Sequence, residues 1–311
     1  AIAAGCPVII KPAGTTPLSC LNFIDLLYQA GLPKAYCQAL ITTREDAEKL
    51  VSDERISFLT FIGSEKVGWR LRSMVSPGVH CALEHGGAAP VIVEKDADLD
   101  KMIPSLIKGG YYHAGQVCVS VQRVYVRESI ADEVLKRFTR QVKNLIVGDP
   151  LDKKTEVGPL ISPKEVDRVE KWVNEAALSG GKILCGGKRI SDTLYEPTVI
   201  LNPGKDARVS VQEIFGPVVC FYTYSSRDDA INEANSLPYC FQAAVFTQDI
   251  HIAFDAVQKL KARAVMVNDH TAFRVDWMPF GGAEQSGQGT GGIGYSIKDM
   301  TREKLIVLNL S

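Results

Sequence analysis

Cys118 and Glu84 are the two side chains whose type and setting point most directly to chemistry. Cys118 ends the segment GQVC at 115–118, a glycine-led loop before a β-prone run at 119–126. Glu84 lies upstream, in the segment LEHGG at 83–87. A thiol that attacks a carbonyl and a carboxylate that activates water are the two groups needed to form and then hydrolyse a thioester. Cys118 is therefore a candidate nucleophile and Glu84 a candidate general base.

Each residue taken alone has a simpler interpretation. Any one of eight cysteines is more often a small buried side chain than a nucleophile. A glutamate before two glycines is more often a solvated turn residue. If Cys118 is the nucleophile, its thiol needs either a depressed pKa or deprotonation once the other reactants are bound.

The elements that would position these residues alternate between strand and helix. In the first part of the chain, short apolar runs at 8–10, 39–42 and 56–61 alternate with helical patterns at 18–30, 45–51 and 65–74. After Glu84 the pattern repeats with longer helices, at 99–108, 130–145 and 164–178. Such alternation predicts right-handed crossovers and an α/β fold with parallel sheets. The tail at 304–310 is β-prone, and an exposed strand there would invite pairing with another subunit.

Composition excludes several classes of protein. The 311 residues carry a net charge of −1 with no long single-sign block, which gives no electrostatic footprint for nucleic acid or an anionic membrane surface. The longest apolar runs are too short to span a bilayer. The eight cysteines form no CxxC pair and no metal-like spacing, so we expect no metal site, reduced thiols and a cytoplasmic location. The chain starts without methionine or a signal peptide and resembles the interior of a longer protein.

Further motifs accompany the cysteine and the glutamate in a fixed order. They are IKP at 10–12, FIGS at 61–64, EIFGP at 213–217 and PFGG at 279–282. Together, and at these separations, the motifs resemble the aldehyde dehydrogenase superfamily along essentially the whole chain. The resemblance implies a partial Rossmann-type cofactor domain at 1–84, a catalytic domain at 85–285, and a return to the cofactor domain with an oligomerisation strand at 286–311. It also implies a homodimer or homotetramer.

The resemblance also implies a cofactor site for NAD or NADP. Lys11 corresponds to a lysine that binds the adenosine ribose, and Gly63 with Ser64 opens a helix that suits a pyrophosphate. Glu213 and Phe215 correspond to the residues beside the nicotinamide ribose and the nicotinamide. Gly14 stands where many members have a glutamate, and its lack of a carboxylate favours tolerance of NADP.

The substrate is less defined by the sequence. Arg274 lies shortly before PFGG, in a region that lines the substrate tunnel in the family, and His113 lies shortly before Cys118. One hypothesis is that Arg274, together with His113, binds the anionic tail of a small aldehyde. The alternative is a structural ion pair between Arg274 and Asp276.

Three functions remain open at this point. Retention of Glu84 favours hydrolysis to a carboxylic acid over transfer of the acyl group to coenzyme A, which is the first rival. The second rival is a non-catalytic binding or structural homologue. The family takes one oxyanion donor from an asparagine before Lys11, and the chain has no such segment, so we expect this chain by itself to be a poor catalyst.

Overall fold

The structure is a computed structural model that describes residues 1–310. The chain divides into two compact units. The first comprises residues 1–83, 275–280 and 288–310, and the second comprises residues 84–274 and 281–287. Among the helices of residues 1–310, none has both the length and the apolar character that a bilayer span requires.

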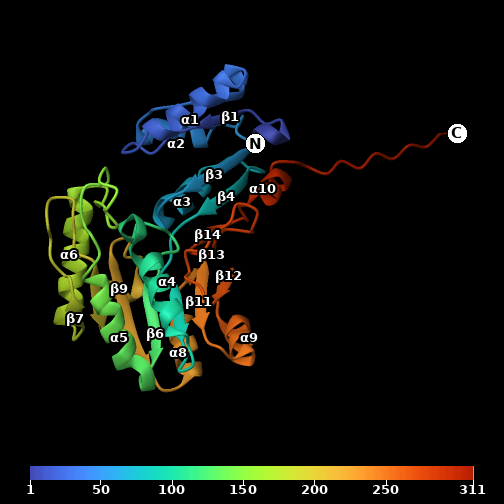
Figure 1. The fold of residues 1–311 in the computed structure, drawn as a ribbon. Helices are drawn as coiled ribbons and strands as arrows, with labels where there is room; N and C mark the ends of the chain where they lie inside the picture. The colour runs from blue at the N-terminus through green and yellow to red at the C-terminus, as the bar shows by residue number, and fades with distance from the viewer. Residues whose placement is uncertain (311) are drawn as a thin grey trace. The chain divides into compact units, whose positions relative to one another are not determined.

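The second unit is built on a seven-stranded sheet in the order β12-β11-β5-β6-β9-β8-β7 (Figure 1). All neighbouring strands are parallel except the pair β7 and β8. The strands are β5 (Pro90–Val93), β6 (Arg123–Arg127), β7 (Lys182–Cys185), β8 (Thr198–Leu201), β9 (Val218–Tyr224), β11 (Gln242–Phe246) and β12 (Ala264–Val267). A short antiparallel pair joins β10 (Tyr239–Cys240) to β13 (Ala283–Glu284). The predicted α/β class is confirmed.

Helices pack on this sheet because their apolar residues recur at helical spacing. They are α4 (Leu99–Tyr111), α5 (Glu128–Val142), α6 (Pro163–Leu178), α7 (Arg208–Val211), α8 (Arg227–Ala234) and α9 (Ile250–Lys259). From α5, Phe138 is fully buried and meets the ring of Phe221 on β9 at 4.9 Å. Burial of one such side chain contributes about 1.5–3 kcal/mol. A second cluster packs Ala230 and Ile231 of α8 and Ala256 of α9 with sheet residues.

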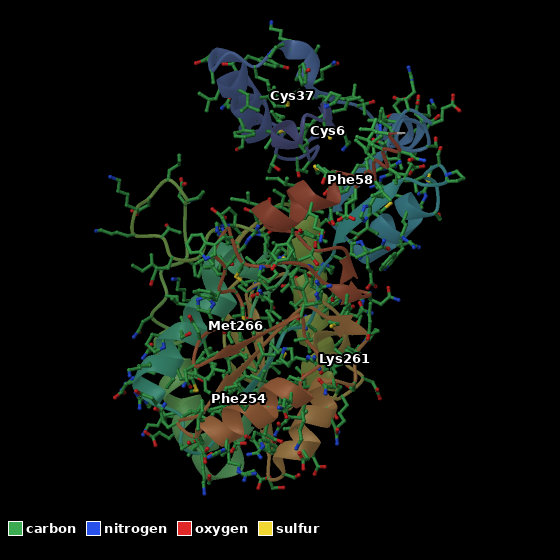
Figure 2. All side chains as sticks on the ribbon, turned by 90° about the vertical axis from the view of Figure 1, so that its right-hand side faces the viewer. Cys6, Cys37, Phe58, Phe254, Lys261 and Met266 are labelled. Carbon is green, nitrogen blue, oxygen red and sulfur yellow. The ribbon has the colours of Figure 1, made fainter. Side chains whose placement is uncertain are left out.

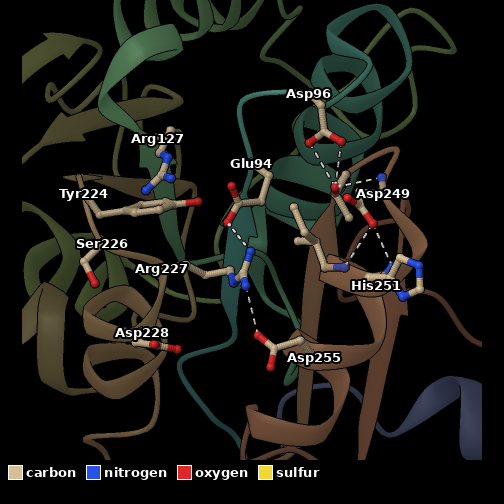
Figure 3. Close-up of polar contacts among 12 residues, drawn as sticks. Glu94, Asp96, Arg127, Tyr224, Ser226, Arg227, Asp228, Asp249, His251 and Asp255 are labelled. Carbon is tan, nitrogen blue, oxygen red and sulfur yellow. Dashed lines mark hydrogen bonds and ion pairs between the residues drawn. The ribbon is translucent and has the colours of Figure 1, made fainter.

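A polar network occupies the carboxyl ends of the central strands (Figure 3). Glu94, which follows β5 and is 2% exposed, lies 3.7 Å from Arg227, and Arg227 also pairs with Asp255 at 3.1 Å. Asp96 accepts hydrogen bonds from the Thr247 hydroxyl at 2.9 Å. Ligands of open parallel sheets usually bind at this end of the strands. In this protein the polar side chains at the carboxyl ends pair with one another. Cys118 lies before β6, at the opposite end of the sheet.

The first unit contains short βα elements. Strands β1 (Val8–Ile10) and β2 (Cys37–Ala39) pair in parallel, and β14 (Gly287–Gln288), β4 (His80–Glu84) and β3 (Phe58–Ile62) form a three-stranded sheet in that order. The helices are α1 (Leu18–Gln29), α2 (Arg44–Val51), α3 (Glu65–Arg72) and α10 (Ile293–Asp299), with 3-10 turns at Ile2–Ala4 and Lys34–Tyr36. Cys6, Cys37 and Phe58 are labelled in this unit in Figure 2.

Three expected strands differ from the structure. Residues 304–310 form no strand and are exposed, because a lone extended segment has no neighbour to accept its backbone hydrogen bonds. The strand expected at 39–42 ends at Ala39, and the run at 119–126 becomes a strand only from Arg123. Residue types alone do not show where hydrogen-bonded pairing starts.

The edge strand of the large sheet is β12, marked by Met266 in Figure 2. Phe254, 61% exposed, lies on the neighbouring α9.

Candidate active site

The loop that carries Cys118 turns sharply after α4. It passes through the 3-10 turn η3 (Tyr112–Gly115), in which His113, Ala114 and Gly115 have φ values of 51°, 55° and 70°. Only glycine adopts such positive φ without strain. A Cβ atom on Gly115 would also lie 2.1 Å from the carbonyl oxygen of Gly216. The glycine of the GQVC segment is therefore required by both backbone conformation and close approach.

Gln116 fixes this loop from the side. Its Nε2 donates to the carbonyl oxygens of His113 at 3.1 Å and Pro159 at 3.2 Å, and its Oε1 accepts from the amide of Ile161 at 2.9 Å. Beyond the cysteine, the Thr271 hydroxyl donates to the carbonyl oxygen of Val119 at 2.7 Å. The backbone on both sides of Cys118 is thus tied to other segments of the second unit.

Cys118 is half-buried in a negatively charged environment. Burial, then the carboxylates of Glu213 and Glu84, raise the pKa of its thiol to about 12, and the positive charge of Arg274 acts in the opposite direction. The free protein therefore holds Cys118 as a neutral thiol at physiological pH. Of the two expected routes to a thiolate, a depressed pKa in the resting state is wrong for this structure.

Glu84 is the last residue of β4 and is half-buried. Burial raises the pKa of its carboxyl, and the nearby charge of Arg274 partly opposes that rise. A carboxylate with a raised pKa is a better proton acceptor near neutral pH than an exposed one. The structure thus brings the charges of Cys118, Glu84, Glu213 and Arg274 close enough to influence one another.

The segment that follows Glu84 is anchored at its backbone. The amide of His85 donates to the carbonyl oxygen of Ser286 at 3.0 Å, and its buried ring Nδ1 donates to the carbonyl oxygen of Gln285 at 2.9 Å. Gly86 leaves room for Glu213, because a Cβ atom there would lie 1.8 Å from Glu213 Oε1. The Glu213 carboxylate therefore lies directly against the backbone of the Glu84 segment.

Two residues of the site were missed by the sequence analysis. Tyr112 is half-buried, and burial, then the proximity of Cys118, raise the pKa of its hydroxyl. Gln122 is 4% exposed and makes three hydrogen bonds to the segment that carries Glu213. Neither belongs to a motif, and only the buried setting of each distinguishes it from other tyrosines and glutamines. The predicted His113 is exposed, and its ring lies 4.9 Å from that of Tyr112.

Two hollows open around these residues. One, with about 300 Å³ of space that includes open solvent, is lined by Cys118 with Gly87, Arg123, Tyr239 and Phe241. The other, with about 200 Å³ measured in the same way, is lined by Gly115, Gln122, Glu213 and Phe215. Among residues 1–310 no cluster of three His, Cys, Asp or Glu side chains could hold a metal ion.

The remaining predicted cofactor residues belong to the first unit. Lys11 is exposed and its Nζ donates to the carbonyl oxygen of Pro12 at 3.2 Å. Around Gly14 there is open space, with no heavy atom within 4 Å of an added Cβ. Ser64 is the N-cap of α3 and makes no side-chain capping bond, and Gly63 lies between it and the end of β3. The backbone amides at the start of α3 have no partner within the helix, as is general for helix N-termini.

Comparison with known proteins identifies a family that matches nearly the whole chain. The family model described as the aldehyde dehydrogenase family matches residues 1–306. A 3-sulfolactaldehyde dehydrogenase from Priestia aryabhattai is 41% identical over the whole chain, and a lactaldehyde dehydrogenase from Methanocaldococcus jannaschii is 38% identical over 99% of it. The chain spans 65% of the first relative and 67% of the second.

Solved structures give a consistent result. Aldehyde dehydrogenase 21 from Physcomitrella patens, in complex with its reaction product succinate, superposes with a TM-score of 0.93 at 41% identity over 96% of this chain and 62% of that chain. Glyceraldehyde-3-phosphate dehydrogenase from M. jannaschii, complexed with NADP, gives a TM-score of 0.89 at 38% identity over 94% of this chain and 64% of that chain. On sequence, motifs and fold, the chain belongs to the aldehyde dehydrogenase family.

Proposed function

We propose that the protein oxidises a small aldehyde carrying an anionic group to the corresponding carboxylic acid, with NAD or NADP as the oxidant. The observation that carries this proposal is the grouping of a thiol, two carboxylates and a guanidinium in one unit. Glu213, Glu84 and Arg274 all act electrostatically on Cys118, Arg274 also acts on Glu84, and Cys118 lines one of the two hollows.

The position of Arg274 supports the proposal that the substrate carries an anionic group. Its charge acts on both Cys118 and Glu84, so it lies close to where an aldehyde carbon would react. Three compounds named for the relatives, 3-sulfolactaldehyde, glyceraldehyde-3-phosphate and succinate, carry an anionic group besides the reacting carbon. A guanidinium binds sulfonate, phosphate or carboxylate through paired hydrogen bonds.

In the first half-reaction Cys118 Sγ attacks the carbonyl carbon. Because the thiol is protonated in the free protein, its proton must leave as the S–C bond forms, and it passes to solvent, which leaves the Glu84 carboxylate ionised for the second half-reaction. The carbonyl oxygen becomes an alkoxide that the backbone N–H of Cys118 stabilises. Bound NAD or NADP supplies the hydride acceptor for the thiohemiacetal carbon, which leaves a thioester on Cys118.

In the second half-reaction Glu84 takes a proton from water. The water oxygen attacks the thioester carbon, the C–S bond breaks, and the acid leaves while Cys118 returns as a thiolate that regains a proton. A positioned general base contributes roughly 10²–10⁴-fold to such a step. The half-buried setting and raised pKa of Glu84 suit this role.

The residues also fit a dinucleotide by their chemistry. The Glu213 carboxylate is an acceptor suited to ribose hydroxyls, and Phe215, 40% exposed, offers an aromatic face beside it. In the first unit, the start of α3 at Ser64 offers backbone amides for phosphate, and Lys11 offers an ammonium. The open space at Gly14 supports tolerance of the additional phosphate of NADP.

Self-association and location remain predictions. The exposed tail is apolar, with Ile306 at 70%, Val307 at 80% and Leu308 at 76% exposure, and such a segment gains both burial and hydrogen bonds by pairing with a second subunit. We therefore propose a homo-oligomer built through this tail. The cytoplasmic location inferred from the reduced cysteines remains a proposal as well.

An aldehyde panel tests the proposal against its two rivals. The purified protein is incubated with anionic and neutral small aldehydes, with NAD or NADP, and with or without coenzyme A. We expect free acid and one equivalent of reduced cofactor per aldehyde, independent of coenzyme A and absent in Cys118→Ala. An acyl-coenzyme A product would support the acylating rival, and cofactor binding without oxidation would support the non-catalytic one.

A further inference from the structure

Glu213 lies in a segment with no regular secondary structure. The segment, residues 212–217, connects α7 to β9. It is bonded to the sheet at Pro217, whose carbonyl oxygen accepts from the amide of Thr198 at 2.8 Å, and Arg168 donates to the carbonyl oxygen of Phe215 at 3.4 Å, but neither contact reaches the residues beside Glu213. Segments of this kind are flexible unless side chains hold them. Because the proposed role of Glu213 depends on the placement of one carboxylate, something must order this segment.

Gln122 makes the contacts that order it. Its Nε2 donates to the carbonyl oxygens of Gln212 at 2.7 Å and Val209 at 3.1 Å, and its Oε1 accepts from the amide of Ile214 at 2.9 Å. The bonded residues 212 and 214 are the two chain neighbours of Glu213. Both ends of one amide group thus hold the backbone on either side of the carboxylate.

Gln122 is itself fixed to the sheet. Its amide donates to the carbonyl oxygen of Ala89 at 3.3 Å, and its carbonyl oxygen accepts from the amide of Cys220 at 2.8 Å. Ala89 lies directly before β5, and Cys220 lies within β9. The segment of Glu84 and the segment of Glu213 therefore share one rigid attachment point at the start of β6.

We infer that Gln122 is the positioning residue that holds Glu213 where its carboxylate can accept hydrogen bonds from the ribose of the nicotinamide cofactor. The inference rests on the proposed function for the role of Glu213, but the holding of the segment stands on geometry alone. A buried amide with three partners is costly to replace, since each lost partner leaves a buried polar group unsatisfied.

The chemistry of the amide is specific. Methionine has nearly the same size but none of the hydrogen bonds. Glutamate keeps the acceptor for Ile214 but sets its second oxygen against the carbonyl oxygens of Gln212 and Val209. When protonated, that second oxygen becomes an O–H donor and restores one of the two bonds. Gln122→Glu should therefore recover as the pH falls, whereas Gln122→Met should not.

The test compares the wild type, Gln122→Met, Gln122→Glu and a matched control, Tyr224→Phe. The control removes the Tyr224 hydroxyl, which donates to the carbonyl oxygen of Val93 at 2.9 Å and lies beside Glu94, at the other end of the sheet. Hydrogen exchange of the peptide covering 212–217 is followed by mass spectrometry. The Kd of NADPH and NADH is measured by fluorescence, and the KM of the aldehyde is measured at saturating cofactor.

We expect Gln122→Met to raise exchange at 212–217 and the cofactor Kd about tenfold each, with the aldehyde KM changed less than twofold. Gln122→Glu should show the same defects at pH 8 and smaller ones at pH 6. Tyr224→Phe should leave exchange at 212–217 and Kd unchanged. Equal effects of Gln122→Met and Tyr224→Phe would overturn the inference. If the wild type bound neither cofactor, the proposed function would fail, and exchange at 212–217 would still decide whether Gln122 holds the segment.

Discussion

Cys118 in the free protein is a neutral thiol surrounded by more negative than positive charge. Its pKa, raised to about 12, keeps the thiol protonated at neutral pH. Burial has the largest effect, and Glu213 and Glu84 add repulsion, while Arg274 favours the thiolate. Reactivity at neutral pH therefore depends on a base and on the bound reactants rather than on the resting thiol.

The first prediction concerns the pH dependence of Cys118 alkylation. Iodoacetamide should modify the Cys118 peptide slowly at pH 8, with a rate that rises about tenfold per pH unit up to pH 11, because only the thiolate reacts. Glu213→Gln removes a negative neighbour and lowers the pKa, so its rate at pH 8 should exceed that of the wild type. Peptide mapping separates Cys118 from the other seven cysteines. A rate that levels off below pH 9 would show a resting thiolate and contradict the structure.

A second residue-scale prediction concerns Arg274. Arg274→Ala should raise the KM of an anionic aldehyde about 10- to 100-fold, since a hydrogen bond to a charged group contributes about 1.5–3 kcal/mol. The KM of a neutral aldehyde of similar size should change little. Arg274→Lys serves as the matched control, because it keeps the charge and loses the paired hydrogen bonds. Its KM for the anionic aldehyde should lie between the values for the wild type and Arg274→Ala. If Arg274→Ala raised the KM of both aldehydes equally, Arg274 would not bind the anionic group. It would act only by shifting the pKa values of Cys118 and Glu84.

At the scale of elements, Cys118 and Glu213 lie on the turns that lead into β6 and β9, whereas Glu84 is the last residue of β4. Motifs such as GQVC and LEHGG could be found in the sequence, because their glycines are required at Gly115 and Gly86 by close approach of other chain segments. Gln122 and Tyr112 could not, because their roles come from long-range contacts that no local pattern encodes. Helix positions were predicted well where apolar periodicity is strong, as in α5 and α6, and strand ends less well.

The sharpest element-scale prediction concerns the turn before Cys118. Gly115→Ala places a Cβ on a residue with φ of 70°, and this Cβ lies 2.1 Å from the Gly216 carbonyl oxygen. The substitution should therefore lower the free energy of unfolding by more than the backbone strain alone, and it should also lower kcat. Gly180→Ala is the matched control: φ is 98°, but no atom lies within 4 Å of the added Cβ. We expect about 1 kcal/mol of lost stability for Gly180→Ala and at least twice that for Gly115→Ala, by urea denaturation. Equal losses would mean that the close approach has no energetic consequence.

At the scale of the whole molecule, the family and fold class could be predicted because ordered motifs run along the chain. The tail at 304–310 could not be assigned correctly for a single chain, because β-prone residues form a strand only when a neighbour accepts their hydrogen bonds. The sequence did predict that Cys118 precedes a strand. The ion-pair network of Glu94, Arg227 and Asp255 could not be predicted, because it joins residues distant in sequence (Figure 3).

The central claim is that Cys118 carries an acyl group that Glu84 then helps water to remove. It is tested most directly by acid-quenching Glu84→Gln after mixing with aldehyde and oxidised cofactor, and by measuring the mass of the Cys118 peptide. We predict a burst of up to one reduced cofactor per subunit and an acyl adduct on Cys118, with steady turnover reduced about 10²–10⁴-fold. Unchanged turnover with no adduct, or an adduct on another cysteine, would contradict the account.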